Sequence, residues 1–247
     1  MCNCTTDYEE YIVEGVDPLD KIRKVDTYLA DRALAAFMME WKAVIDEMMI
    51  QLSSRYAKAI LQQMPKKPIK YGMKIWALAG CESYYLFAWR PYLGRKDPIK
   101  AQASALGEGY VHTLILKHLI PVEWHNRNFC VITDNYFTYF KIMCDSLVVG
   151  VYMAGVNKLT KPKKDPDVEG TTWPFPPYGK REERFLQRGW AREAFFVLGE
   201  RRSQRLIGAY TWHDNRFVQL LCTCAMTSDP YQACLLYTSD AADDRVS

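Results

Sequence analysis

The sequence predicts an α/β protein built on a mixed β-sheet. Three observations indicate this fold class: apolar residues at helical spacing early in the chain, two β-favouring runs joined by a short turn, and strands alternating with helices after them. With 247 residues, 49% of them hydrophobic, the chain can bury the core of one large domain or two small ones. We therefore expect an ordinary globular protein.

The first predicted element is an N-terminal helical region over residues 1–65. Asp17 and Pro18 provide a helix cap followed by a first-turn proline. Helix is favoured from there to about Gln63. The apolar residues that recur at helical spacing are Ile22, Val25, Leu29, Ala33, Phe37 and Trp41.

A β-hairpin follows where the prolines of residues 64–70 interrupt the helical pattern. Residues 71–79 and 85–92 are rich in β-favouring side chains, and the short turn at 80–83 joins them. This hairpin predicts an antiparallel part of the sheet.

Helices and strands then alternate. After a polar linker at 95–102, we expect helices over 107–119 and 136–147, and strands over 129–133 and 148–156. The order β-β-α-β-α-β adds a parallel part to the antiparallel hairpin. Such a mixed sheet suits an RNase H-like core, which we assign to residues 66–156.

Residues 157–224 differ in composition and predict a basic loop followed by a β-rich insertion. Strand-like runs occur at 193–198, 205–212 and 216–223. The loop before them is rich in lysine and proline. Its lysines could follow a nucleic-acid backbone or could simply be solvated, and these lysines are Lys158, Lys161, Lys163 and Lys164.

Composition argues against several other classes of protein. The net charge of +3 does not by itself require a nucleic-acid partner. The eight cysteines include no C-x-x-C pair, which argues against a zinc site and favours reduced thiols. No apolar run approaches the roughly 20 residues of a membrane helix. We expect a soluble intracellular protein that does not associate with membranes.

Asp134 ends the β-favouring part of the stretch FCVITDNYFTY at residues 129–139. The carboxyl end of a sheet strand is where α/β folds place ligands and metals. An aspartate ahead of a helix is also a favoured N-cap. Spacing alone leaves both roles open for Asp134.

Eight segments of the chain resemble, in the same order, the transposase domain of the piggyBac family and its domesticated, transposon-derived relatives. The resemblance extends from about Asp17 to Thr223. The matching segments are DPLDKIRK (Asp17–Lys24), IDEMMI (Ile45–Ile50), MPKKPIKYGMKIWALA (Met64–Ala79), PYLGR (Pro91–Arg95), LGEGYV (Leu106–Val111), ITDNYFTY (Ile132–Tyr139), YMAGVNK (Tyr152–Lys158) and TWHDNRFVQLLCT (Thr211–Thr223).

This resemblance implies an RNase H-like catalytic core in which three aspartates bind two divalent ions, Mg²⁺ or Mn²⁺. The implied activity is cleavage and transfer of DNA strands in cut-and-paste transposition at terminal repeats. DNA is the implied partner. A homodimer and a nuclear location are implied as well.

Carried onto this chain, the family's second aspartate falls on Asp134 and its first on Gly80. Glu82 is a weak substitute for the missing first acid. The third aspartate belongs to a glycine-rich segment that has no match after Thr223. We therefore expect a catalytically defective copy, or alternatively a domesticated, non-enzymatic DNA-binding or interaction protein. Asp46 and Glu47 match family acids to which we assign no role.

The end of the chain predicts a truncation. Residues 234–243 read CLLYTSDAAD, which a transposase mosaic-end adapter of sequencing libraries encodes in one reading frame. We interpret residues 225–247 as a truncated tail, with residues 234–247 derived from the adapter. The third aspartate is accordingly expected beyond the truncation.

Overall fold

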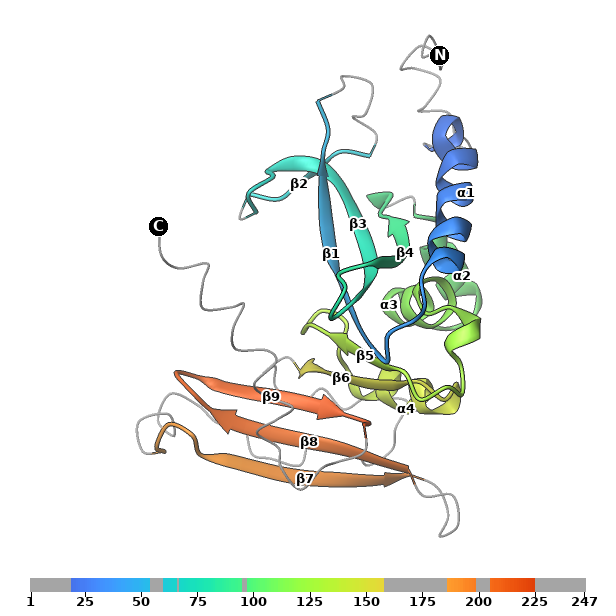
Figure 1. Cartoon of the computed structure of the whole chain (residues 1–247). Coiled ribbons are helices and arrows are strands. Elements are labelled where there is room, and N and C mark those ends of the chain that lie inside the picture. The colour runs from blue at the N-terminus through green and yellow to red at the C-terminus, as the bar shows by residue number, and fades with distance from the viewer. Residues whose placement is uncertain are drawn as a thin grey trace. The chain divides into compact units, whose positions relative to one another are not determined.

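The computed structural model divides the chain into two compact units. The first unit is Met1–Phe137 with Val148–Val151, and the second is Thr138–Leu147 with Tyr152–Ser247. The domain boundaries expected from the sequence stay a prediction. The structure describes residues 19–53, 60–65, 67–94, 97–157, 186–198 and 205–224 (Figure 1).

A mixed sheet forms the centre of the first unit. The strand β3 pairs antiparallel with β1 on one side and with β4 and the short β2 on the other, and β1 also pairs parallel with β5. The order β4-β3-β1-β5 therefore contains both pairing directions, as the sequence predicts. The strands are β1 (Lys42–Gln51), β2 (Gln62–Gln63), β3 (Tyr71–Gly80), β4 (Leu86–Pro91) and β5 (Cys130–Thr133).

The strand β1 corrects the prediction of an N-terminal helical region. Helix is confirmed only for α1 (Asp20–Ala36), and Lys42–Gln51 is the central strand of the first unit. Ala43 and Ile45 are buried there while Asp46 is exposed, which is the two-residue alternation of a strand. Methionine and isoleucine on both faces of the segment hide this alternation in the sequence, so the helix prediction is wrong at these residues.

Four helical segments follow the hairpin. The prediction of a helix over 107–119 is confirmed, but the polar linker at 95–102 is wrong because a helix begins at Pro98. Asp97 caps that helix by accepting a hydrogen bond from the Ile99 N–H at 3.0 Å. The segments are α2 (Pro98–Ala105), α3 (Tyr110–Thr113), the π-helical η4 (Leu114–Leu119) and the 3₁₀-helical η5 (Val122–Trp124).

Packing on both faces of the hairpin builds the core of the first unit. The helix α1 runs along β4, and η4 packs on β3 and β4 (Figure 1). Phe87 meets Trp124 edge to face with ring centroids 5.4 Å apart. The indole N–H of Trp89 donates to Asp26 at 2.8 Å and so ties α1 to the sheet. No helix in the described parts of the chain is long and apolar enough to cross a membrane.

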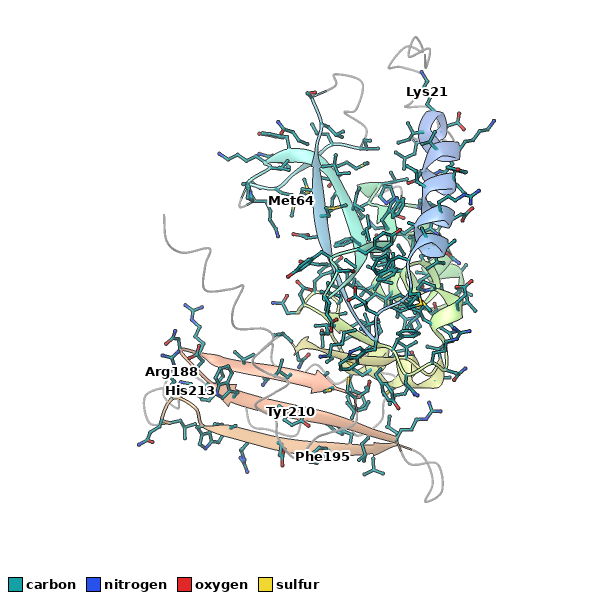
Figure 2. All side chains as sticks on the ribbon, viewed as in Figure 1. Lys21, Met64, Arg188, Phe195, Tyr210 and His213 are labelled. Carbon is teal, nitrogen blue, oxygen red and sulfur yellow. The ribbon has the colours of Figure 1, made fainter. Side chains whose placement is uncertain are left out.

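The second unit contains an antiparallel sheet in the order β6-β9-β8-β7. Its inner face is buried through alternating residues of β8 such as Ile207 and Ala209. On the other face, the ring of Phe195 meets that of Tyr210 at 6.3 Å (Figure 2). The elements are α4 (Phe140–Val148), β6 (Tyr152–Asn157), β7 (Ala191–Leu198), β8 (Arg205–His213) and β9 (Phe217–Cys222).

The elements predicted for this part of the chain are confirmed with small shifts. All three strands of the β-rich insertion are present, as are the helix before it and the strand β6. The helix starts at Phe140 rather than near residue 136, and it extends through Val148. The strand β6 consequently begins at Tyr152 rather than at residue 148.

Gly80 is the last residue of β3, and the carboxylate of Glu40 lies directly beside it. A Cβ atom on Gly80 would lie 2.4 Å from Glu40 Oε1, which is closer than real contacts allow. Glu40 Oε2 accepts a hydrogen bond from the Glu82 N–H at 2.8 Å, and Oε1 accepts one from the Ser83 N–H at 3.0 Å. The carboxylate therefore occupies the space of a side chain at residue 80 and holds the turn after β3.

The contact between Gly80 and Glu40 predicts a coupled pair of substitutions. Gly80→Ala should displace the carboxylate and lower the free energy of unfolding by about 0.5–1 kcal/mol, the usual net value of such hydrogen bonds. In the Glu40→Ala background the same substitution should cost much less, because the carboxylate is already gone. Urea unfolding of the two single variants and the double variant measures this coupling. Equal costs of Gly80→Ala in both backgrounds would contradict it.

Acid should weaken the same turn. Hydrogen bonds from the Ser83 hydroxyl and the Glu82 N–H lower the pKa of Glu40 below its usual 4.5. A carboxylate with a lowered pKa stabilises the folded state above its unfolded pKa, and the stabilisation is lost as the pH falls through the folded pKa. In urea titrations, the stability difference between wild type and Glu40→Gln should therefore be constant above about pH 5 and decrease as the pH falls through the lowered pKa of Glu40.

Candidate functional site

Asp134 and Asp46 are brought side by side by the parallel pairing of β5 with β1. In this register Thr133 pairs with Ile45; Asp46 is the next residue of β1, and Asp134 is the first residue after β5. Val44 and Ile132 also pair, so the two aspartates lie on the face of the sheet that these residues share. The structure thus joins a predicted site residue to one whose role the sequence left open.

The two carboxylates influence each other electrostatically. Partial burial of its carboxyl group, followed by the negative charge of Asp134, raises the pKa of Asp46 above its usual range. The N–H of Glu47, which donates to Asp46 Oδ1 at 2.7 Å, and the charge of Lys67 oppose this rise. Two like charges held at neighbouring positions are an arrangement that a bound cation would stabilise.

Oxygen ligands of this kind suit Mg²⁺ and Mn²⁺, which prefer carboxylates. The residues present therefore fit a divalent ion as two of its ligands. No group of three or more His, Cys, Asp or Glu side chains gathers within the parts of the chain that the structure describes. A third acid stays a prediction that concerns residues outside them.

Asp134 does not cap a helix. Its Oδ1 accepts a hydrogen bond from the N–H of Tyr136, two residues along, at 2.8 Å. The next helix, α4, starts only at Phe140. The side chain therefore closes a tight local turn of the kind that aspartate favours, which restrains the loop after β5.

Gly80 and Glu82 lie away from this pair of acids, contrary to our expectation of the first acid. Gly80 pairs with Ala43, which is three residues before Asp46 and so faces the opposite side of the sheet. Two strand spacings and three residues separate Gly80 from Asp134, or roughly 14 Å. The N–H of Glu82 binds Glu40 at that distant turn. The position that we expect for the first acid, Gly80, and its expected substitute, Glu82, therefore lie away from Asp134.

Glu47, the neighbour of Asp46, has a different environment. Its carboxylate binds Lys67 with an N–O distance of 3.2 Å and also pairs with Lys74. Burial of the Glu47 carboxyl opposes ionisation, but hydrogen bonds from Lys74 and Lys67 outweigh it and lower the pKa of Glu47. Adjacent acids on one strand thus have opposite shifts, and Glu47, which points to the other face of β1, holds two cations there.

Aromatic rings surround Trp76, the residue of β3 that pairs with Glu47. Trp76 pairs with Glu47 across the sheet and stacks on Tyr136, with ring centroids 5.4 Å apart and planes 12° from parallel. Phe137 meets Trp76 edge to face at 5.2 Å. The ammonium of Lys74 lies 4.1 Å from the centre of a Trp76 ring. Glu47, Lys74 and the rings therefore lie together on one face of the sheet.

The sequence alone assigns no role to Asp46, the residue that the structure places beside Asp134. The signal of a strand is the two-residue alternation around it, with Ala43 and Ile45 inward and Asp46 outward, which differs from the helix predicted for this segment. The lysines predicted to contact nucleic acid lie outside the described residues, and these are Lys158, Lys161, Lys163 and Lys164.

The chain is similar to one known family and to a solved structure. The family model described as Transposase IS4 matches residues 4–189. A structure titled "Cryo-EM structure of piggyBac transposase synaptic complex with hairpin DNA" matches with a TM-score of 0.56 at 16% identity. That match covers 88% of this chain and 40% of that one, so the chain spans about two fifths of the length of that transposase. Comparison with curated protein sequences gives no match.

The structural likeness confirms the predicted RNase H-like fold. The family match extends over most of the chain and includes β1, which carries Asp46, and β5, which ends just before Asp134. On this basis the chain belongs to the transposase family described as Transposase IS4.

Proposed function

We propose that the first unit is the metal-binding core of a piggyBac-like transposase domain that cleaves and transfers DNA strands. Asp46 and Asp134 serve as its first two metal ligands, with Mg²⁺ or Mn²⁺ as the ion. The observation that carries the proposal is the register of β1 and β5, which sets the two aspartates beside each other. Under this proposal Gly80 is no sign of a lost catalytic residue.

Each aspartate has a defined task in this proposal. Asp46 would bind the ion as a carboxylate, and because burial and the charge of Asp134 raise its pKa, metal binding should weaken as the pH falls. The hydrogen bond from the Tyr136 N–H keeps Asp134 oriented at the end of β5. When bound, divalent ions would activate the attacking oxygen and stabilise the leaving oxygen of the phosphodiester.

The basic residues beside the acids support DNA as the partner. Lys67 keeps 45% of its side chain exposed while it binds Glu47, so its ammonium can also reach a phosphate. Lys74 is more buried and helps to hold Glu47 in place. A homodimer and a nuclear location belong to the same proposal, as the resemblance to piggyBac transposases implies.

A domesticated DNA-binding or interaction protein without catalytic activity is the second candidate. The observation that favours it is that two carboxylates, rather than three, come together in the described ranges. Such a protein would keep the fold and its basic surface. It would bind DNA in a salt-sensitive way without cutting it.

Metal binding tests the pair of acids. Mn²⁺ should bind the full chain and lower the free-ion signal in electron paramagnetic resonance, and Asp46→Asn and Asp134→Asn should each weaken binding at least tenfold, because each removes a charged ligand. Saturating Mn²⁺ at about 100 times the dissociation constant should stabilise the wild type by about 2.7 kcal/mol. Glu123→Gln, at an exposed acid of the same unit, is the control. Mn²⁺ binding that survives both aspartate substitutions would refute the proposed site.

Without metal, the substitution Asp46→Asn should stabilise the protein rather than weaken it. Asp46→Asn removes a like charge beside Asp134 and should raise the free energy of unfolding without metal by about 0.5 kcal/mol at neutral pH, the scale of partly exposed charge pairs. Denaturant unfolding in the presence of a chelator measures the change. A destabilised Asp46→Asn variant would show that the carboxylate has a structural role instead.

DNA nicking separates the enzyme from the domesticated protein. The full-length natural protein, which would include the third acid expected beyond the truncation, should nick supercoiled DNA with Mg²⁺ or Mn²⁺. Asp46→Asn or Asp134→Asn should reduce the rate at least 100-fold, whereas Glu123→Gln should not. If the wild type binds DNA with a clear salt dependence but nicks none, the second candidate is correct and the enzymatic proposal fails.

A further inference from the structure

Tyr136 presents an open aromatic face next to the acids. Its side chain is 51% exposed although the ring stacks on Trp76, which is only 2% exposed. Phe137 meets the ring of Tyr136 edge to face, with centroids 5.0 Å apart and planes at 86°. The ring is thus supported by two neighbours while half of its surface faces solvent.

Buried hydrogen bonds fix the support beneath this ring. The indole N–H of Trp76 donates to the Tyr110 hydroxyl at 2.9 Å, and that hydroxyl donates to Asp97 Oδ2 at 3.2 Å. Burial and the nearby Asp97 raise the pKa of Tyr110, so its hydroxyl keeps the proton that it donates. Asp97 in turn caps α2. The plane of Trp76, and with it that of Tyr136, is therefore set by the helices and the sheet together.

The ring is also joined directly to a proposed metal ligand. The N–H of Tyr136 donates to Asp134 Oδ1, so the ring and the carboxylate belong to one closed turn. On the other side, the ammonium of Lys74 lies 5.8 Å from the ring centre. A positive charge and an exposed ring beside paired acids match the parts of a nucleotide, which are a phosphate and a planar base.

We propose that Tyr136 is a stacking platform for the DNA base next to the phosphodiester that is held at Asp46 and Asp134. This inference rests on the proposed function and adds the contact that orients the nucleotide. Stacking does not discriminate strongly among bases, because every base has a flat π-face. The platform therefore positions the strand without reading its sequence.

A base reaches this ring only when it leaves its own stack. Unpaired bases cost less to displace than paired ones. DNA with an unpaired nucleotide beside the cleaved bond should accordingly bind more tightly than the matched duplex. The difference should shrink when the ring is removed.

The choice of a base over a protein segment follows from the surroundings of the ring. The exposed ring lies beside the ammonium of Lys74, and its own backbone N–H is bound to the carboxylate of Asp134. A packed protein segment would have to bury these charges. A nucleotide instead brings a phosphate that the cations and a bound ion would neutralise.

Fluorescence of 2-aminopurine tests the platform. An oligonucleotide carrying an unpaired 2-aminopurine beside the cleavage position is bound to the full chain with Ca²⁺, and stacking on Tyr136 should quench the fluorescence. Tyr136→Leu should abolish the quenching and weaken binding about 5- to 100-fold, the range for loss of one base stack. Tyr136→Phe should keep both. Tyr71→Leu is the matched control, because Tyr71 is 53% exposed in the same unit.

Two further measurements separate failure of the platform from failure of the proposed function. Near-ultraviolet circular dichroism checks that Tyr136→Leu is folded, and Mn²⁺ binding checks its acids. If Tyr136→Leu binds Mn²⁺ but retains the quenching and affinity of the wild type, the platform is refuted while the metal site stands. If the wild type binds neither Mn²⁺ nor the oligonucleotide, the proposed function and the platform both fail.

Discussion

The candidate site depends on one interaction, the parallel pairing of β1 with β5. The two strands come from segments about 90 residues apart. The last pair in their register is Ile45 with Thr133, and this pair decides which side chains lie next to each other just after it. A shift by one residue would turn each side chain to the other face of its strand. Ala43 and Ile45 are fully buried, so burial of the core enforces the register that places Asp46 beside Asp134.

Neighbouring residues compensate for the charge that this pairing gathers. Asp46 and Asp134 repel each other, which is unfavourable for folding, yet Glu47 on the same strand lies between two lysines and is stabilised. Trp76 of β3 pairs with Glu47 of β1, and its indole N–H donates a hydrogen bond to the Tyr110 hydroxyl. A local electrostatic conflict surrounded by well-satisfied neighbours is expected of a functional site, where charge is kept ready for a ligand.

The glycine at residue 80 shows how linear matching and structure differ. Ungapped alignment led us to read Gly80 as a lost acid, because the residue follows a strand within a family segment. In the structure, Glu40 occupies the space beside Gly80, and the strand ends far from Asp134. The acid that does meet Asp134 lies in a different matching segment, which the helix prediction had hidden. The helix prediction at Lys42–Gln51 therefore also concealed that Asp46 is the neighbour of Asp134.

The sequence by itself determined the hairpin of β3 and β4, the strand that leads into Asp134, the helices around it and the strands β7 to β9. These elements depend on local periodicity and turn residues, which short segments carry. It also identified the resemblance to transposases and one of the two acids. Only the tertiary structure decided that Lys42–Gln51 is the central strand, that Asp46 is the neighbour of Asp134, and that Tyr136 rests on Trp76. Those relations arise from pairing and packing between segments distant in the chain, which no local pattern specifies.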